Sequence, residues 1–389
     1  MNLISSALKS ILDFVLISIS PYVLIFRAFI EFLMGSNYLR ISLALLLSSF
    51  FVYYSPEDIT DIYRHYELFD EYQTAGDSLF LLNKYTGLGF LFISFDFLGI
   101  AKEGLPFLTG FIVVYVMLGA AEFKCEGVDR CWRPLIWVVF LLLPPFFFYV
   151  TGLRWGLAVV IFFHALLSEM KGRRWYKFYI LLPLLFHFGM IIPIFTYFFS
   201  KYISTSHVKR NVRLTIVVTS ILSSFLLVFI IQNAILLFNI EGIIGRSTES
   251  YLTGRFAIGY LDVLSGGVKA VFLSKMILLI LLFSYIFVRN NSKGGLAAFS
   301  DYMIIITLMF AFSGLFVIYD RISVITIFTL LICQDFRGLN LFKIRLETFL
   351  LCIFVMYLGI MEKILYMRIY TDIYFGFDAF LDFYERLLF

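Results

Sequence analysis

Two arginines stand where one apolar segment ends and the next begins. Arg154 lies in PFFFYVTGLRWGLAVVIFF, and Arg321 lies in FSGLFVIYDRISVITIFTLL. A guanidinium stays charged and presents a fork of N–H donors that matches phosphate oxygens, so the two side chains could clamp a phosphate group. Alternatively, each arginine only reaches the membrane–water interface or pairs locally, Arg321 with the adjacent Asp320.

An acidic segment near residues 55–80 offers a second kind of chemistry. If PEDITDIYRHYELFDEY forms a helix, Asp61, Arg64 and His65 share one face, and Asp58 lies one turn earlier. A carboxylate on that face could take a proton from a substrate hydroxyl as a general base. The alternative is a charge-dense helix face that is simply solvated.

Two more segments carry polar groups that could bind a substrate. Arg246, Tyr251 and Arg255 lie in RSTESYLTGRFAIGY, a mixture of donors and aromatic rings that suits a sugar phosphate and equally an ordinary solvated loop. His187 lies in FYILLPLLFHFGMIIPIFTYFF, where it could donate or accept a hydrogen bond. It could also be a packed polar residue bonded to a backbone carbonyl.

Several familiar catalytic motifs are missing from the sequence. There is no Walker A loop, no zinc-type His/Cys cluster, no Gly-x-Ser-x-Gly elbow and no acidic metal cage. The four cysteines have neither a paired framework nor metal-ligand spacing, so we expect packing residues. We therefore expect no cofactor and no metal, and an activated substrate or a gradient as the source of energy.

The elements that must position these residues are membrane helices. The chain has 389 residues, of which 61% are hydrophobic and 15% charged, and its mean hydropathy is +0.93. Runs such as LPFLTGFIVVYVMLGAA have about the length that a helix needs to cross the hydrocarbon core. We predict an all-α, polytopic membrane protein with about ten transmembrane helices and one transmembrane domain over residues 1–389.

Basic residues between the apolar runs predict the topology, because cytoplasmic loops are rich in Lys and Arg. Since the topology explains the positive charge, the charge gives no reason to expect nucleic-acid binding. The basic connections are Lys124 to Arg133, Lys171 to Lys177, SKYISTSHVKRNVR, RNNSK and DFRGLNLFKIR. The outer face then receives the loops near 55–80, 151–154, 233–268 and 318–321 and the tail 366–389.

Two apolar segments break simple alternation and are predicted to be re-entrant or interfacial. The glycine-containing segment LFLLNKYTGLGFLFISFDFLGIAKEG would have both ends outside. In FYILLPLLFHFGMIIPIFTYFF, the interrupters Pro183, Gly189 and Pro193 permit either a re-entrant hairpin with His187 near its tip or one kinked span.

Four short motifs resemble the EpsG-type, Wzy-like family of O-antigen and polysaccharide polymerases. DITDIYRHYELF is similar to the family's D-x-x-x-Y-x-x-x-F element, and GLRWGLAVVIFFHAL is similar to I-R-Q-x-x-A. LLFHFGMIIPIF resembles F-H-x-S-A-x-I-x-x-P, and YDRISVITIF resembles R-x-x-x-Y-F. The chain departs from these patterns at Trp155, Gly189 and Ile325, where the family has Gln, Ser and Tyr.

The resemblance implies a GT-C-like membrane glycosyltransferase in the bacterial cytoplasmic (inner) membrane. Such an enzyme joins oligosaccharide repeat units carried on undecaprenyl pyrophosphate at the periplasmic face, within membrane lipid and in some systems with a chain-length regulator protein. Residues matched to the family or standing near the matches then divide into two groups. The expected catalytic residues are Asp61, Arg154, His187 and Arg321, and the expected substrate-binding residues are Asp58, Arg64, His65, Arg246, Tyr251 and Arg255.

Two other functions remain open from the sequence. A lipid-linked oligosaccharide flippase would also use arginines to bind pyrophosphate, but transporters usually show related halves and binding groups near the membrane midplane. A membrane-bound acyltransferase could use His187 as its base.

Overall fold

In the computed structural model, the described part of the protein is helical. The described residues are 39–49, 51, 61–75, 86–129, 132–144, 153–203, 210–238, 266–289, 295–313, 315–334, 336 and 346–370. No strand occurs in these ranges, which confirms the all-α prediction for this part of the chain.

The chain divides into two compact units. The helices of the first unit are α3 (Leu39–Ser49), α4 (Asp61–Ala75), α6 (Thr86–Leu98), α7 (Gly104–Cys125), α8 (Arg133–Leu142), α10 (Leu153–Met170), α11 (Tyr176–Tyr179), α12 (Pro183–Phe186) and the 3-10 helix η3 (Phe188–Met190). Those of the second unit are α13 (Ile191–Tyr202), α14 (Arg210–Phe238), α17 (Gly266–Arg289), α18 (Gly295–Phe312) and α19 (Phe316–Cys333). Helix α20 (Leu346–Tyr370) contributes to the second unit up to Phe354 and to the first from Val355.

Among the described residues, three helices are long and apolar enough to cross a membrane, namely α7, α10 and α19. Eighteen or more residues at a rise of about 1.5 Å each cover most of a hydrocarbon core of about 30 Å. Shorter apolar stretches lie in other helices, including Phe272–Val288 of α17 and Thr348–Met361 of α20. The total of about ten spans, the GT-C-like topology and the single domain stay predictions.

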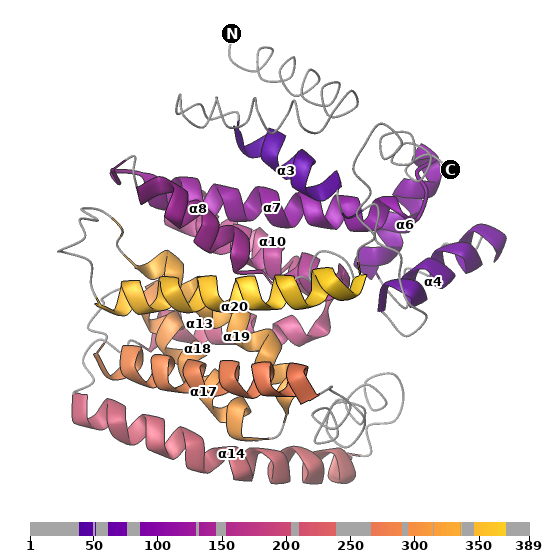
Figure 1. The fold of residues 1–389 in the computed structure, drawn as a ribbon. Coiled ribbons are helices and arrows are strands. Elements are labelled where there is room, and N and C mark those ends of the chain that lie inside the picture. Colours follow the sequence, from indigo (N-terminus) through magenta and orange to yellow (C-terminus); the bar gives the residue numbers. More distant parts are fainter. Residues whose placement is uncertain are drawn as a thin grey trace. The chain divides into compact units, whose positions relative to one another are not determined.

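Helix α7 forms the middle of the first unit, where it packs against α3, α8 and α10 (Figure 1). Small residues let neighbours approach it closely. A Cβ on Gly119 would lie 2.6 Å from Cζ of Arg40, whose Nε donates to the carbonyl oxygen of Tyr115 at 2.7 Å. The arginine also stacks over the Tyr115 ring at 3.6 Å and lies 3.6 Å from Glu122, so α3 is joined to α7 by a charged side chain.

In the second unit, α18 lies between α13, α14 and α19 and packs against all three. A buried ion pair joins two of these helices: Nη1 of Arg213 on α14 lies 3.0 Å from Oδ2 of Asp301 on α18. The same nitrogen donates to the carbonyl oxygen of Phe287 on α17 at 3.0 Å. One arginine therefore ties together three helices inside this unit.

The boundaries of three predicted outer segments are corrected by the structure. Asn233–Phe238 belong to α14 and α17 begins at Gly266, so both ends of the expected loop 233–268 are helical. The expected loop 318–321 lies inside α19, which begins at Phe316. The first residues of the expected tail, 366–370, belong to α20. The sequence assigned charged residues to loops, but a charge that is paired inside the fold does not end a helix.

The interrupted apolar segment is broken into short pieces, as its prolines predict. Pro183 stands at the start of α12, and the backbone of His187 is extended where that helix ends. Helix α6 has 13 residues, which is short for a membrane span. Its interfacial or re-entrant placement stays a prediction.

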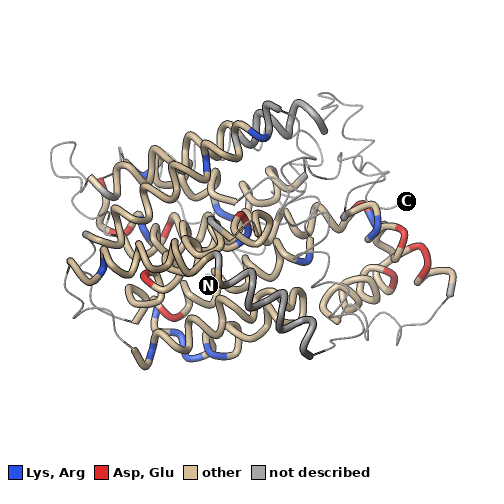
Figure 2. Tube along the Cα trace, turned by 90° about the horizontal axis from the view of Figure 1, so that it is seen from below, with Lys and Arg blue, Asp and Glu red and all other residues tan. Residues whose placement is uncertain are grey.

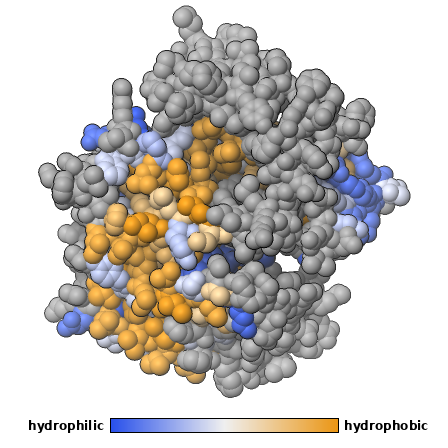
Figure 3. Space-filling view, in the orientation of Figure 1, coloured by the Kyte–Doolittle hydropathy of each residue, from blue (hydrophilic) through white to orange (hydrophobic). Residues whose placement is uncertain are grey.

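Apolar side chains gather on the face of the described residues that Figure 3 shows. Exposed examples are Phe195 on α13, Leu222 on α14, Leu281 on α17 and Ile353 on α20. Acidic residues gather on α4, and a group of red segments lies at the right of Figure 2. A lipid environment suits the first kind of surface, and water suits α4.

Candidate functional site

Arg154 lies in the first turn of α10, one of the three helices that can cross a membrane. The flanking side chains Leu153 and Trp155 are buried, and Arg154 itself is half-buried. Packing of Leu153 and Trp155 therefore fixes the start of α10 and holds the Arg154 guanidinium at that end of the helix. This agrees with the prediction that the arginine opens this helix.

His65 of α4 lies on the buried side of an amphipathic helix and is only 4% exposed. Ile62, Tyr66 and Phe69 are buried with it, and Phe69 meets Phe92 of α6 edge to face at 5.2 Å. Burial, together with the positive charges of Arg154 and Arg64, lowers the pKa of His65 to about 3. The histidine is therefore neutral, and Arg154 lies close enough to act on it electrostatically.

The predicted common face of Asp61, Arg64 and His65 is wrong for two of these residues. Arg64 is exposed whereas His65 is buried, because neighbours in a helix point about 100° apart. Asp61 is the first residue of α4, and its side chain lies outside the description. Asp58, Arg246, Tyr251 and Arg255 also lie outside the described residues.

His187, which follows α12 in the interrupted apolar segment, contacts the start of α10. Its ring meets the indole of Trp155 edge to face with 4.9 Å between centroids. Its Nδ1 accepts a hydrogen bond from the backbone N–H of Gly189 at 3.0 Å. A neutral imidazole that accepts at Nδ1 carries its proton on Nε2, so His187 is set to donate. The structure thus brings His187 and His65 to the same helix end as Arg154.

Two glycines allow this close arrangement. A Cβ on Gly189 would lie 3.0 Å from Nδ1 of His187 and would press on the imidazole. A Cβ on Gly87 of α6 would lie 2.8 Å from the Phe186 ring and 2.9 Å from the backbone oxygen of Leu185. Gly87 therefore lets α6 approach α12 just before His187.

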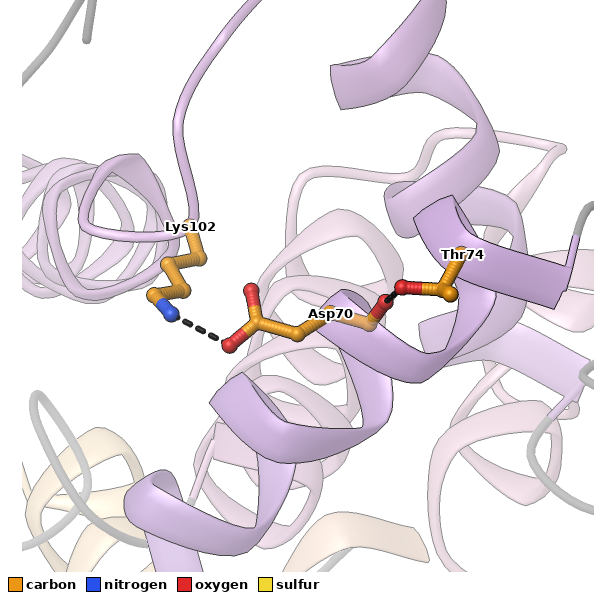
Figure 4. Close-up of polar contacts among 3 residues, drawn as sticks. All are labelled: Asp70, Thr74 and Lys102. Carbon is orange, nitrogen blue, oxygen red and sulfur yellow. Dashed lines mark hydrogen bonds and ion pairs between the residues drawn. The ribbon is translucent and has the colours of Figure 1, made fainter.

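Helix α4 is fastened to the rest of the first unit by polar contacts of its acidic side. Nζ of Lys102 lies 2.5 Å from Oδ2 of Asp70 (Figure 4). Within α4 itself, Oγ1 of Thr74 donates to the backbone oxygen of Asp70 at 2.8 Å. On the next turn, Nε2 of Gln73 donates to Oδ1 of Asp96 at 3.4 Å. The Asp70 carboxylate thus has a structural partner, which favours anchoring over general-base work for this residue.

Arg321 lies in the second turn of α19 in the second unit. The sequence offered Asp320 as its local partner, but Asp320 forms an ion pair with Lys275 of α17, with 2.5 Å between Nζ and Oδ1. Lys275 was missed by the sequence analysis. Its signal is a single lysine inside the apolar run AVFLSKMILLILL.

The buried pair of Arg213 and Asp301 was also missed. Arg213 belongs to a basic stretch that was assigned to a cytoplasmic connection, yet its side chain is 2% exposed and that of Asp301 is 1% exposed. The detectable signal was Asp301, a lone carboxylate in the apolar segment LAAFSDYMIIITL.

No group of three or more metal-ligating side chains occurs among the residues that the structure describes. Cys125 and Cys352 are buried free thiols, and Cys333 is a half-buried one. This placement agrees with the packing role expected for them.

Comparisons of the chain with protein-family models, curated proteins and solved structures find no match. Over the described part of the chain, the fold and the site define a class only. It is an all-helical protein with three candidate membrane-spanning helices, with an arginine at the start of one and a paired charge in another. The resemblance to EpsG-type polymerases therefore depends on the short motifs alone.

Proposed function

We propose that the chain is a polysaccharide polymerase of the O-antigen type, which joins oligosaccharide repeat units carried on undecaprenyl pyrophosphate. One observation carries the proposal: Arg154 at the start of α10 lies near the buried His65 and beside Trp155, which contacts His187. All of these residues belong to the motifs that resemble the polymerase family. An oligosaccharide diphosphate offers the anionic and hydroxyl groups that these side chains bind.

In this reaction, a hydroxyl oxygen of the acceptor unit attacks the anomeric carbon of the donor unit. The bond from that carbon to the diphosphate oxygen breaks, and its electron pair stays on the departing undecaprenyl diphosphate. The hydroxyl proton passes to a base. Arg154 stabilises the charge that grows on the leaving diphosphate, because fixed donors at a developing charge lower the barrier. The donor is already activated, so no nucleotide is consumed.

The candidate base is Asp61. His65 is a poor base because its pKa is about 3. His187 engages Nδ1 with the Gly189 N–H and donates from Nε2, which suits a contact with a sugar or phosphate oxygen. The same geometry argues against an acyltransferase in which His187 is the base. Arg64, exposed on α4, is a candidate for binding the acceptor.

The charges at the two ends of α10 support a periplasmic active site in a bacterial inner membrane. The helix begins beside Arg154 and ends at Met170, after which the exposed residues Lys171, Arg173 and Arg174 follow. Basic loops stay in the cytoplasm, so the Arg154 end would face the periplasm.

A flippase is the second candidate, and one observation favours it. The pairs Lys275–Asp320 and Arg213–Asp301 lie within apolar helices of the second unit. Ionisable groups at membrane depth often mark the path of a transported substrate. A flippase would move the same lipid-linked unit without forming a glycosidic bond.

The test is deletion of the gene in its host, followed by complementation and gel analysis of the surface polysaccharide. We expect wild type to restore a ladder, and Arg154→Ala to give a single repeat unit as the deletion does. Arg174→Ala is the matched control, because it removes an exposed arginine beyond the other end of α10. A ladder of unchanged length with Arg154→Ala present in the membrane would refute the site. Loss of all surface polysaccharide, with lipid-linked units held on the cytoplasmic side, would favour the flippase.

A further inference from the structure

The first unit has a cluster of charges at the far end of α10 from Arg154, and the proposed mechanism does not use it. Arg40 is the second residue of α3, Glu122 lies in the last turn of α7, and Lys171 follows the last residue of α10. Nη1 of Arg40 lies 3.6 Å from Oε2 of Glu122, and Nζ of Lys171 lies 5.3 Å from the centroid of the Phe123 ring on α7. The start of α3 and the ends of α7 and α10 therefore meet at one place in this unit.

Packing fixes the position of Arg40 in the cluster. Its Nε donates to the carbonyl oxygen of Tyr115 at 2.7 Å, and its guanidinium lies 3.6 Å over the Tyr115 ring. A Cβ on Gly119 would lie 2.6 Å from Cζ of Arg40, so the glycine leaves the room that the guanidinium occupies. The Arg40 side chain is still 18% exposed. It is therefore held in place and can also be reached from outside.

Positive charge is crowded at this end of the unit. Arg173 lies two residues after Lys171, and both side chains are exposed. Partial burial lowers the pKa of Lys171, and the charges of Arg40 and Arg173 lower it further. Glu122 and Glu126 act in the opposite direction but do not cancel this effect. Three cations thus repel one another beside two carboxylates, and an anion bound there would relieve the repulsion.

The surroundings of the cluster suit a membrane surface. Trp175 lies in the same connection and is 73% exposed, and Phe178 is 58% exposed. Tryptophan is enriched at the membrane–water interface, where its ring lies at the level of the lipid head groups. The basic connections that follow α7 and α10 predict the cytoplasmic side for this end. Basic segments there attract anionic lipids, and basic pockets between membrane helices bind their head groups.

We propose that Arg40, Lys171 and Arg173 form a binding site for the phosphate of an anionic phospholipid head group. Their N–H groups donate to phosphate oxygens, and their clustered charges favour an anionic lipid over a zwitterionic one. This inference does not depend on the proposed function, because it concerns the other end of α10. The competing explanation is a diffuse positive charge that only sets the topology of the chain.

Lipid binding to the purified full-length chain in detergent tests the site, with phosphatidylglycerol as the probe and phosphatidylcholine as the zwitterionic reference. We expect wild type to bind phosphatidylglycerol more tightly. Lys171→Gln and Arg173→Gln should each raise its Kd about fivefold, which corresponds to about 1 kcal/mol. Arg174→Gln is the matched control, because it removes an equal charge from the same connection and Arg174 is not among the charges that act on Lys171. Its Kd should stay that of wild type.

A change that keeps every charge gives a second test. The methyl group added by Gly119→Ala would displace the Arg40 guanidinium. A built site should then bind phosphatidylglycerol about fivefold more weakly, whereas a diffuse charge should attract the lipid as before. Lys171→Arg, which keeps the cation, should bind like wild type. Melting temperatures show that each variant remains folded, and the two exposed-residue variants test the site even if Gly119→Ala does not fold.

Three results would overturn the inference. The first is equal binding of phosphatidylglycerol and phosphatidylcholine to wild type. The second is a diffuse response, in which Arg174→Gln weakens binding as much as Lys171→Gln does, or folded Gly119→Ala binds like wild type. The third is displacement of the lipid by an equal concentration of glycerol 3-phosphate, because the site would then take a soluble phosphate ester.

Discussion

The indole of Trp155 and the imidazole of His187 meet edge to face, with 4.9 Å between ring centroids and 80° between ring planes. Trp155 adjoins Arg154 at the start of α10, so this contact places the histidine of one motif beside the arginine of another. In the motif that GLRWGLAVVIFFHAL resembles, glutamine stands where this chain has Trp155.

Truncation of this tryptophan should damage both packing and activity. Trp155 is buried, and removal of such a side chain to alanine costs about 3–5 kcal/mol. We expect Trp155→Ala to lower the melting temperature in detergent and to shorten the polysaccharide ladder. Trp155→Phe keeps an aromatic ring beside His187, so the melting temperature and the ladder length should fall less in this variant. Full stability of Trp155→Ala would show that the contact is not formed.

The buried neutral His65 predicts a loss of stability in mild acid. Its folded pKa of about 3 lies below the ordinary value of 6.5, so between these values the unfolded chain binds more protons. Stability therefore rises with pH across this window and falls as the pH drops below about 6.5. From pH 7 to pH 5 the loss is about 2 kcal/mol, since each pH unit below the unfolded pKa is worth up to about 1.4 kcal/mol per proton.

Melting temperatures at pH 7 and pH 5 check this prediction. Arg154 and Arg64 are the charges that oppose protonation, and neither changes its charge over this range. The variant His65→Phe cannot be protonated and should show a smaller drop than wild type. Equal drops in the two proteins would mean that His65 is not buried in the neutral form.

The acidic residues of α4 should differ in their effect on activity. Asp61→Asn removes the proposed base and should reduce polymer length strongly, with the protein still present in the membrane. Asp70→Asn breaks only the partly exposed pair with Lys102, which is worth at most about 1 kcal/mol. A gel ladder for each variant makes the comparison. A full ladder with Asp61→Asn, or its loss with Asp70→Asn, would reverse this assignment.

The pair of Arg213 and Asp301 should behave as a buried structural tie. Removing one partner leaves the other charge buried without compensation, which costs about 3–5 kcal/mol. We expect Arg213→Met and Asp301→Leu each to lower the melting temperature sharply. The double variant should regain much of the loss, because an apolar pair of similar size is often neutral or better. Additive losses in the double variant would contradict the prediction.

Much of the helical architecture follows from the sequence, because it depends on local properties. Composition alone predicts helices in an apolar solvent, and the run 105–121 lies within α7 as predicted. The break around His187 was also predictable, because Pro183 and Pro193 prevent a continuous helix. Arg154 at the start of α10 followed from the same local reasoning.

The pairing of charges could not be predicted, because each partner lies far away in the chain. Sequence reasoning placed Asp320 and Arg321 in a loop and offered them to each other, whereas the fold presents Lys275 to Asp320 from another helix. In the same way, the sequence suggests that Arg213 is a basic loop residue, whereas in the fold it forms an ion pair with Asp301 of α18.

The sequence by itself determined that the chain is helical and apolar, and it selected Arg154, His65 and His187 as residues with unusual chemistry. Only the tertiary structure decided that α4 turns His65 inward and leaves Arg64 outside, and that Trp155 meets His187. Helix formation and membrane preference depend on neighbours along the chain, so the order of residues fixes them. The protonation state of a histidine and the partner of a charge depend on groups that only packing brings within a few ångströms.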